Sequence, residues 1–244
     1  MGESEPARTE GEGPGGDIQV IARIATLLEC LDPGSPSLDT ATTAKVLGVG
    51  RSTAHRYLAS LEKRGLLRRR DVTTYEPGPA LCRIGTLALA RLGVVEAAGP
   101  VMHELVQEVR STVVLSVWGG QAPVVARVVP DTSRFTTLSV EVGRSLPPEA
   151  AQSRLFAAHH ARSRRVGGRL RVLDDGLIPI GDLLVARQVY PGGGVKTIAA
   201  PVRTADGTIV ATLAVIGMTV FMPDDEDDVL VERLTDAVSR IAVN

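Results

Sequence analysis

The chain has 244 residues, a formal net charge of −1 and 44% hydrophobic residues, so it is long and apolar enough for two domains with their own cores. Aromatic residues make up only 3%, which disfavours recognition of single-stranded nucleic acid by base stacking. No apolar run approaches the roughly 20 residues that a membrane-spanning helix needs.

Residues 1–16 are rich in Gly, Glu and Pro, so we expect a disordered tail, and they lack the apolar core of a signal peptide. Asp17 is placed to cap the helix that follows. Apolar residues recur in this helix at helical spacing, namely Ile21, Ile24, Leu28 and Leu31. The helix is expected to be the first of a three-helix core.

A helix-turn-helix pattern comes next. Asp39 is a good N-cap for a short helix over residues 40–47, and Gly48 is placed to end it. The second helix begins after Gly50, and its face opposite the core is polar and basic, so it can read a DNA major groove. Its buried stripe is predicted at the spacing i, i+4 and i+7, on Ala54, Leu58 and Leu61.

Residues 66–78 predict two short strands around a turn, which would make the unit winged. From residue 51 to residue 70 the chain has seven basic residues and one acidic residue, so its positive charge is local. We therefore expect residues 17–78 to be a winged helix-turn-helix domain that binds double-stranded DNA. The alternative for the helix alone is a charged face that serves only solubility.

The base contacts are assigned to the first turns of the second helix, because only these turns reach the base edges. Arg56 is the main candidate, together with Ser52, Thr53 and His55. Lys63 lies further along the same outer face. Phosphate is the expected main partner of the basic residues at the helix start and in the wing, namely Arg51, Arg68, Arg69 and Arg70.

Residues 79–94 predict a linker helix that is apolar over a wide arc and carries few charges. Such a helix is not complete as a monomer surface, so we expect it to pack against a second copy of itself or to lie between domains. The dimer contact is assigned to Leu81, Ile84 and Leu92.

Residues 95–244 predict an α+β domain. A helix over residues 96–110 is followed by a hairpin whose turn contains Gly119 and Gly120. The closing helix starts near Pro223 with five consecutive acids, which suit the positive end of its dipole. Between them we expect a third strand, a helix and three more strands, over residues 135–143, 150–162, 185–190, 195–203 and 208–217.

In these motifs the chain resembles the IclR family of bacterial transcriptional regulators. The resemblance implies a winged helix joined by a linker helix to a GAF-like effector domain with an antiparallel sheet, in dimers or tetramers that bind inverted-repeat operators. It is carried by GRSTAHRYLASLEKRGLL (50–67), YEPGPALCRIG (75–85), VGRSLPPEAAQS (142–153) and VKTIAAPVRTADGTIVATLAVIG (195–217).

The resemblance also implies a small-molecule effector between the sheet and the loop after the third strand. The positions that line this site in the family correspond here to Leu146, Gln152, Ser153, Thr197, Ala214 and Ile216. Few of these are charged or strong donors, so we expect a larger, mostly apolar ligand held by a few hydrogen bonds. The alternative is that no ligand binds and the domain serves only assembly.

We expect no enzyme, no metal site and no cofactor, because no nucleophile motif or purposeful carboxylate pair is present. His159 and His160 are adjacent, whereas two ligands of one metal favour i, i+4 spacing on a helix. Cys30 and Cys82 are too few for a disulfide framework and are expected to be reduced core thiols in a cytoplasmic protein. A protein-interaction module remains as an alternative function, although a basic helix and wing do not fit it.

The arginines between Arg162 and Arg171 form a second basic cluster. We expect a solvated or oligomer-facing surface there, and auxiliary contact with phosphate is the alternative.

Overall fold

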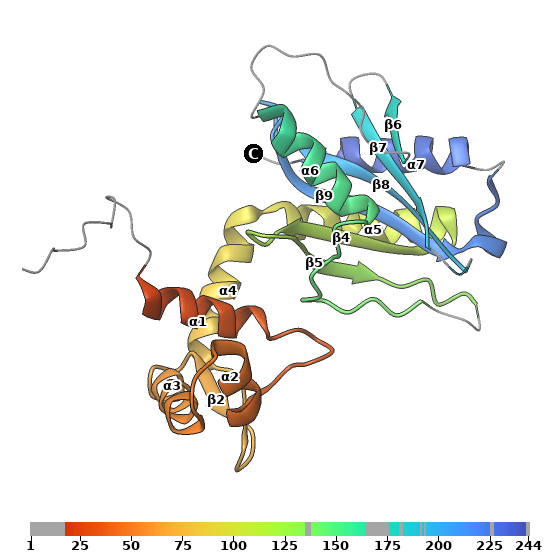
Figure 1. Cartoon of the computed structure of the whole chain (residues 1–244). Helices are drawn as coiled ribbons and strands as arrows, with labels where there is room; N and C mark the ends of the chain where they lie inside the picture. Colours follow the sequence, from red (N-terminus) through yellow and green to blue (C-terminus); the bar gives the residue numbers. More distant parts are fainter. Residues whose placement is uncertain are drawn as a thin grey trace, which may run out of the picture. The chain divides into compact units, whose positions relative to one another are not determined.

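The structure is a computed structural model of the chain. It describes residues 18–134, 138–163, 176–180, 183–190, 192, 194–224 and 227–242. The chain forms two compact units, Met1–Cys82 and Arg83–Asn244, and both are drawn in Figure 1.

The N-terminal unit combines three helices with a small antiparallel sheet in which β3 lies between β1 and β2. The helix-turn-helix and the wing are thereby confirmed. β1 was not predicted, because two residues are too short for a recognisable strand pattern. The elements are α1 (Gln19–Glu29), β1 (Leu38–Asp39), α2 (Thr40–Leu47), α3 (Arg51–Lys63), β2 (Leu67–Arg69) and β3 (Thr74–Pro77).

Both predicted ends of α2 are confirmed. The side chain of Asp39 accepts a hydrogen bond from the backbone N–H of Thr42 at 2.7 Å, as an N-cap does. Gly48 ends the helix in the left-handed conformation, with φ at 63°, a conformation that glycine adopts without strain.

The buried stripe of α1 differs from the prediction. Leu27 is fully buried, while Ile21 is 56% exposed, so the helix turns Leu27 rather than Ile21 toward the core. Ile24, Leu28 and Leu31 pack beside Leu27 as expected. Ile21 lies one turn before the part of α1 that meets the core. Asp17, the predicted cap, lies outside the described residues.

The exit of the wing lies directly against the end of α3. The backbone N–H of Gly78 donates to Leu66 O at 2.8 Å, and that of Ala80 donates to Gly65 O at 2.9 Å. A Cβ on Gly78 would contact Gly65 O and would lie 2.7 Å from the carbonyl carbon of Leu67. Only glycine fits this close approach of two backbone segments.

The C-terminal unit is built on a six-stranded antiparallel sheet with the order β5-β4-β9-β8-β7-β6. The helix α4 (Pro79–Leu92) begins before the boundary between the units. The other elements are α5 (Val94–Val109), β4 (Thr112–Trp118), β5 (Pro123–Val129), α6 (Ala151–Ser163), β6 (Leu177–Ile180), β7 (Leu183–Val189), β8 (Val195–Arg203), β9 (Ile209–Met218), the 3-10 turn η1 (Thr219–Phe221) and α7 (Asp227–Arg240).

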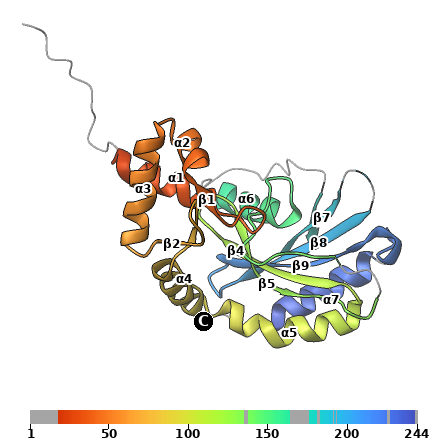
Figure 2. The same cartoon turned by 90° about the horizontal axis from the view of Figure 1, so that it is seen from below.

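Helices cover both faces of this sheet, with α5 and α7 on one face and α6 on the other (Figure 2). Alternation along β8 and β9 supplies both cores. Ile198 and Leu213 belong to the larger core under α5 and α7. Ala199 and Ala214, which pair across the two strands, belong to the smaller core under α6.

The start of α7 is tied to the sheet by a charge cluster. Lys196 on β8 is fully buried, and its Nζ lies 2.5 Å from Asp227 Oδ1 and 3.1 Å from Asp224 Oδ1. Arg187 on β7 donates from Nε to Asp227 Oδ2 at 2.6 Å. The helix therefore begins at Asp227 rather than near Pro223, and Asp224 pairs with the sheet from a position before it.

One predicted strand is wrong, and one strand of this unit was missed. Residues 138–143 form no strand. The chain instead pairs with β5 from the end of this range onward, where the N–H of Gly143 donates to Val125 O at 2.8 Å and that of Leu146 donates to Pro123 O at 2.9 Å. β6 was not predicted, because its four residues include a proline, which weakens a strand pattern.

Two further findings concern α4. Cys82 is exposed rather than part of a core, whereas Cys30 is half-buried, and both are free thiols.

Among the residues that the structure describes, no single helix is long and apolar enough to cross a membrane. The pair α4 and α5 passes that test only together, across a 70° bend.

Candidate nucleic-acid interface and ligand pocket

The outer side of α3 presents the side chains that were predicted to contact bases. Ser52, His55 and Arg56 are exposed, and Thr53 is half-buried. The opposite side of the helix is anchored in the core of the unit by the predicted stripe of Ala54, Leu58 and Leu61. Because the helix is held from behind, its outer side is a stable surface for recognition.

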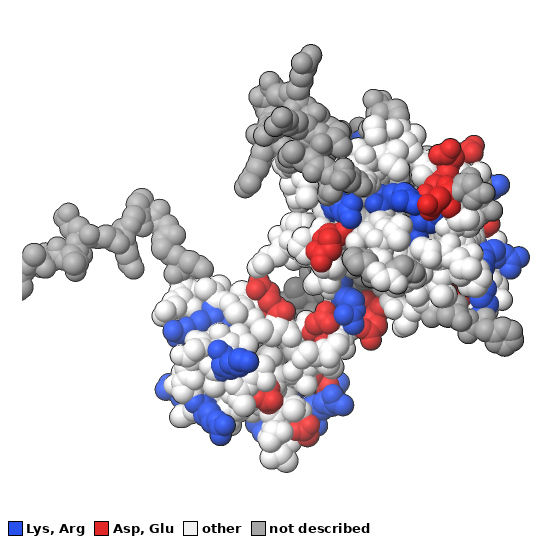
Figure 3. All heavy atoms as spheres, turned by 45° about the vertical axis from the view of Figure 1, so that its right-hand side comes forward, with Lys and Arg blue, Asp and Glu red and all other residues white. Residues whose placement is uncertain are grey.

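The basic side chains on this side of α3 remain available. Within the described part of the chain, no ion pair or hydrogen bond engages the side chains of Arg51, Arg56 or Lys63, and all three are exposed. In Figure 3 the visible face of the N-terminal unit carries several Lys and Arg side chains, with acidic side chains among them. Unpaired cations on a rigid helix are suited to contacts with phosphate and with guanine.

The three wing arginines lie in different surroundings. Arg68 is paired with Glu76, from Nη2 to Oε1, at 2.7 Å. Arg69 is bound by Glu62, Tyr75 and the backbone of Val72. Arg70 is exposed, and its side chain has no partner among the described residues. Of the three, Arg70 therefore has the donors that a phosphate contact needs.

The turn of the wing is closed by Asp71. Its carboxylate accepts hydrogen bonds from the backbone N–H groups of Thr73 at 2.8 Å and Thr74 at 3.0 Å, and from both threonine hydroxyls. The hydroxyl of Thr74 is the main reason that the pKa of Asp71 is lowered to about 2. The turn is therefore an ordered structure that presents Val72, which is 87% exposed, at its tip.

The predicted effector positions are brought together only in part. Thr197 and Ile216 are directly opposite each other on β8 and β9, and Ala214 lies on the same face of the sheet as Ile216. Gln152 and Ser153 lie in the first turn of α6, which covers this face. Leu146 is separate, because its backbone pairs beside β5, two strands away from β9.

Gln152 fills the space between α6 and the sheet. Its side chain is buried, and its Nε2 lies 3.1 Å from Ser116 Oγ on β4, 3.3 Å from Thr212 O on β9 and 3.5 Å from Val114 O. The amide thus bridges two neighbouring strands at the position where an effector is expected.

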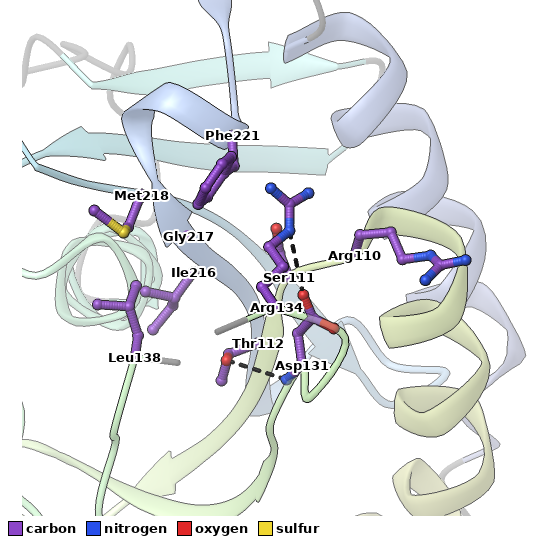
Figure 4. Close-up of a pocket in the computed structure, with 10 residues that line it drawn as sticks. All are labelled: Arg110, Ser111, Thr112, Asp131, Arg134, Leu138, Ile216, Gly217, Met218 and Phe221. Carbon is purple, nitrogen blue, oxygen red and sulfur yellow. Dashed lines mark hydrogen bonds and ion pairs between the residues drawn. The ribbon is translucent and has the colours of Figure 1, made fainter. Parts of the chain in front are cut away.

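A hollow opens beside this face, and it has a cavity volume of about 20 Å³, enough for one water molecule. Figure 4 shows Leu138, Ile216 and Met218 on one side of it, and Asp131 and Arg134 on the other. Of the predicted effector residues only Ile216 lines it. The full lining is Arg110, Ser111, Thr112, Asp131, Arg134, Leu138, Ile216, Gly217, Met218 and Phe221.

The polar part of the hollow was not predicted. The guanidinium of Arg134 lies 4.0 Å from the centre of the Phe221 ring, and its Nε is 3.6 Å from Asp131 Oδ2. Burial alone would raise the pKa of Asp131, but hydrogen bonds from Ser133 and the nearby Arg134 lower it overall. Asp131, Ser133 and Arg134 are close in the sequence, whereas Phe221 comes from a separate segment, so the sequence does not show that they meet.

Two other predicted features stand apart from the site. His160 packs edge-on against Trp118, with ring centroids 4.6 Å apart, which is a packing contact on the surface of α6. The side chains of the Arg162–Arg171 cluster lie outside the described residues.

The comparisons with known proteins agree with this geometry. Residues 20–71 match the IclR helix-turn-helix domain. The chain is 41% identical over 134 residues to the HTH-type transcriptional regulator Rv1719 of Mycobacterium tuberculosis. The aligned stretch covers 54% of this chain and 50% of that protein. The chain thus spans about half the length of this relative.

Two solved structures share the fold over both units. One is an IclR transcriptional regulator from Alicyclobacillus acidocaldarius, with a TM-score of 0.68 at 19% identity over 93% of this chain and 98% of that chain. The other is an IclR homolog from Microbacterium hydrocarbonoxydans complexed with 4-hydroxybenzoate. Its TM-score is 0.65 at 20% identity, and the match covers 91% of this chain and 96% of that chain. Identities this low show a common fold.

Proposed function

We propose that this chain, which belongs to the IclR family, is a cytoplasmic transcriptional regulator that binds double-stranded DNA and is not an enzyme. The observation that carries the proposal is the outer side of α3, where exposed basic side chains, unpaired among the described residues, stand on a helix anchored in the core. Such a helix can enter the major groove while the wing follows the backbone. Footprinting on DNA that flanks its own gene tests the proposal directly.

Replacing Arg56 with alanine is expected to relax the sequence preference at one base pair of the operator, with a loss of about 1–3 kcal/mol for the preferred base. The reason is that Arg56 is exposed on the outer side of α3 within its first two turns, where a guanidinium can reach guanine. Competition binding against operators mutated one position at a time measures this loss.

Arg64→Ala is the matched control, because Arg64 is exposed just beyond the last turn of the same helix. It should weaken all sequences alike or have no effect. Equal losses on the operator and on random DNA from Arg56→Ala would remove Arg56 from base recognition.

We also propose that the chain binds inverted repeats as a homodimer or tetramer. Paired half-sites require paired recognition helices. The exposed apolar residues of α4 supply a surface for a second copy, because Ile84, Leu87 and Leu92 are 49%, 54% and 39% exposed. A symmetric contact of one helix with its own copy is the simplest way to cover them.

For the C-terminal domain, we propose a larger, mostly apolar effector near Thr197, Ala214 and Ile216. The Microbacterium hydrocarbonoxydans homolog was solved with 4-hydroxybenzoate, whose ring supports an aromatic molecule as the first candidate, although its carboxylate does not match the apolar lining proposed here. A ligand here must displace Gln152 or replace its hydrogen bonds to Ser116 and Thr212.

The wild-type protein is expected to bind apolar aromatic molecules or lactones more tightly than small keto acids. A small carboxylate buried among the predicted lining residues would lack a cationic partner, which costs several kcal/mol. Calorimetric titration with both classes measures the difference. Tight binding of a keto acid that is lost in Thr197→Val would show that the ligand class is wrong.

A second candidate is a domain that binds no effector and serves only assembly. The three acceptors that already satisfy the Gln152 amide favour it. This second candidate is supported if no compound of either class binds the wild-type protein, while operator binding and self-association persist.

A further inference from the structure

We propose that Arg69 is a positioning residue, which fixes the wing against the recognition helix through Glu62 instead of contacting DNA phosphate. The proposal rests on the proposed DNA-binding function, and it replaces the role that was assigned to Arg69 from the sequence.

Four of the five N–H donors of Arg69 are already in use. Its Nε and Nη2 donate to the two carboxylate oxygens of Glu62 at 3.2 and 3.1 Å. Nη2 also donates to the Tyr75 hydroxyl at 2.7 Å, and Nη1 donates to Val72 O at 3.3 Å. A guanidinium has five N–H donors, so one is left, and a bidentate contact with phosphate would require breaking this arrangement.

The partners come from separate parts of the fold. Glu62 is in the last turn of α3, Tyr75 is on β3 and Val72 is in the turn of the wing, while Arg69 itself is on β2. The guanidinium also lies 4.8 Å from the centre of the Tyr75 ring, and Tyr75 is 1% exposed. One planar group thus sets the angle between the recognition helix and both strands of the wing.

Glu62 is the only acidic residue between positions 51 and 70, and an acid close to DNA weakens binding unless a neighbouring cation such as Arg69 compensates its charge. The hydrogen bond from Arg69 lowers the pKa of Glu62, so the carboxylate remains charged. A two-pronged bond between a guanidinium and a carboxylate fixes geometry in a way that a lysine ammonium cannot reproduce.

Arg70 provides the contrast within the same wing. It is exposed, and its side chain has no partner among the described residues, so its charge is free to neutralise a phosphate. The two neighbouring arginines therefore have different roles. Arg69 fixes the shape of the wing, and Arg70 contributes to DNA affinity.

The test compares Arg69→Lys, Glu62→Gln and Arg70→Gln in the full chain, on operator and random duplex DNA over a series of salt concentrations. Loss of one phosphate contact lowers the slope of log K against log salt by about 0.9. We expect this for Arg70→Gln, together with weaker binding to both DNAs.

Arg69→Lys is expected to keep the slope and the affinity for random DNA, because it keeps the charge, but to weaken operator binding about tenfold. Glu62→Gln should also weaken operator binding, although removal of an acid near DNA would otherwise tighten it. The double variant should be no weaker than either single variant, since both remove the same bond. Thermal melts check that each variant is folded.

Operator binding by Arg69→Lys equal to that of the wild type, or tighter operator binding by Glu62→Gln, would overturn the proposal. A wild-type protein that prefers no duplex sequence would instead overturn the proposed function, so the two failures can be told apart.

Discussion

Replacing Asp227 with asparagine is expected to lower the free energy of unfolding of the C-terminal unit by about 3 kcal/mol. Asp227 is the closest partner of the fully buried Lys196 and also accepts from Arg187. Asp224 remains as a second partner, but its side chain is 78% exposed. Loss of Asp227 therefore leaves a buried ammonium poorly compensated, which is far more costly than loss of a surface ion pair.

Denaturant unfolding followed by Trp118 fluorescence measures this change, because the chain has a single tryptophan and it lies on β4 of this unit. Asp228→Asn is the matched control, since Asp228 is the next residue of α7 and is exposed, and it should change stability by less than about 0.5 kcal/mol. Equal effects of the two substitutions would show that the cluster does not stabilise the unit.

Introducing glutamates at Ile84 and Leu92 of α4 is expected to weaken self-association at least about 100-fold, while each protomer remains folded. No residue of α4 is buried in the described part of the chain, so the monomer tolerates polar side chains there. In a dimer the same positions would bring four carboxylates into an apolar contact, which is strongly unfavourable.

Sedimentation velocity over a range of protein concentrations measures the change in self-association. Thr86→Glu with Ala90→Glu is the control, because it adds the same charge to the same helix about half a turn away from the Ile84 and Leu92 stripe. If both pairs leave the oligomer unchanged, α4 is not the dimer contact. If both abolish it equally, the contact is not confined to the predicted stripe.

Local signals predicted the N-terminal unit well. The cap at Asp39 and the end at Gly48 depend on interactions within a few residues, so the sequence is sufficient to place them. The buried face of α3 follows from periodicity alone. Ile21 was misplaced because periodicity does not show how far along α1 the other helices reach.

Pairing between distant segments could not be predicted in the same way. The chain after β5 pairs through Gly143 and Leu146, that is, from the last residue of the predicted strand onward, because the register of an edge segment is set by the strand it meets. For the same reason the neighbours of Arg69, Gln152 and Lys196 were not foreseen. Each of these polar side chains finds its partners on other elements, and residue type alone does not show whether a basic or amide side chain faces solvent or is buried and hydrogen-bonded.

The close approach at Gly78 has a mechanical consequence. The exit of the wing is joined to the end of α3 by two backbone hydrogen bonds and by a close contact at Gly78 that leaves no room for a Cβ. The first turn of α4 therefore cannot rotate independently of the recognition helix. The compliant joint of the linker must therefore lie further along α4. A Cβ on Gly85 would meet no atom of the described residues within 4 Å, and Gly93, with φ at 63°, separates α4 from α5.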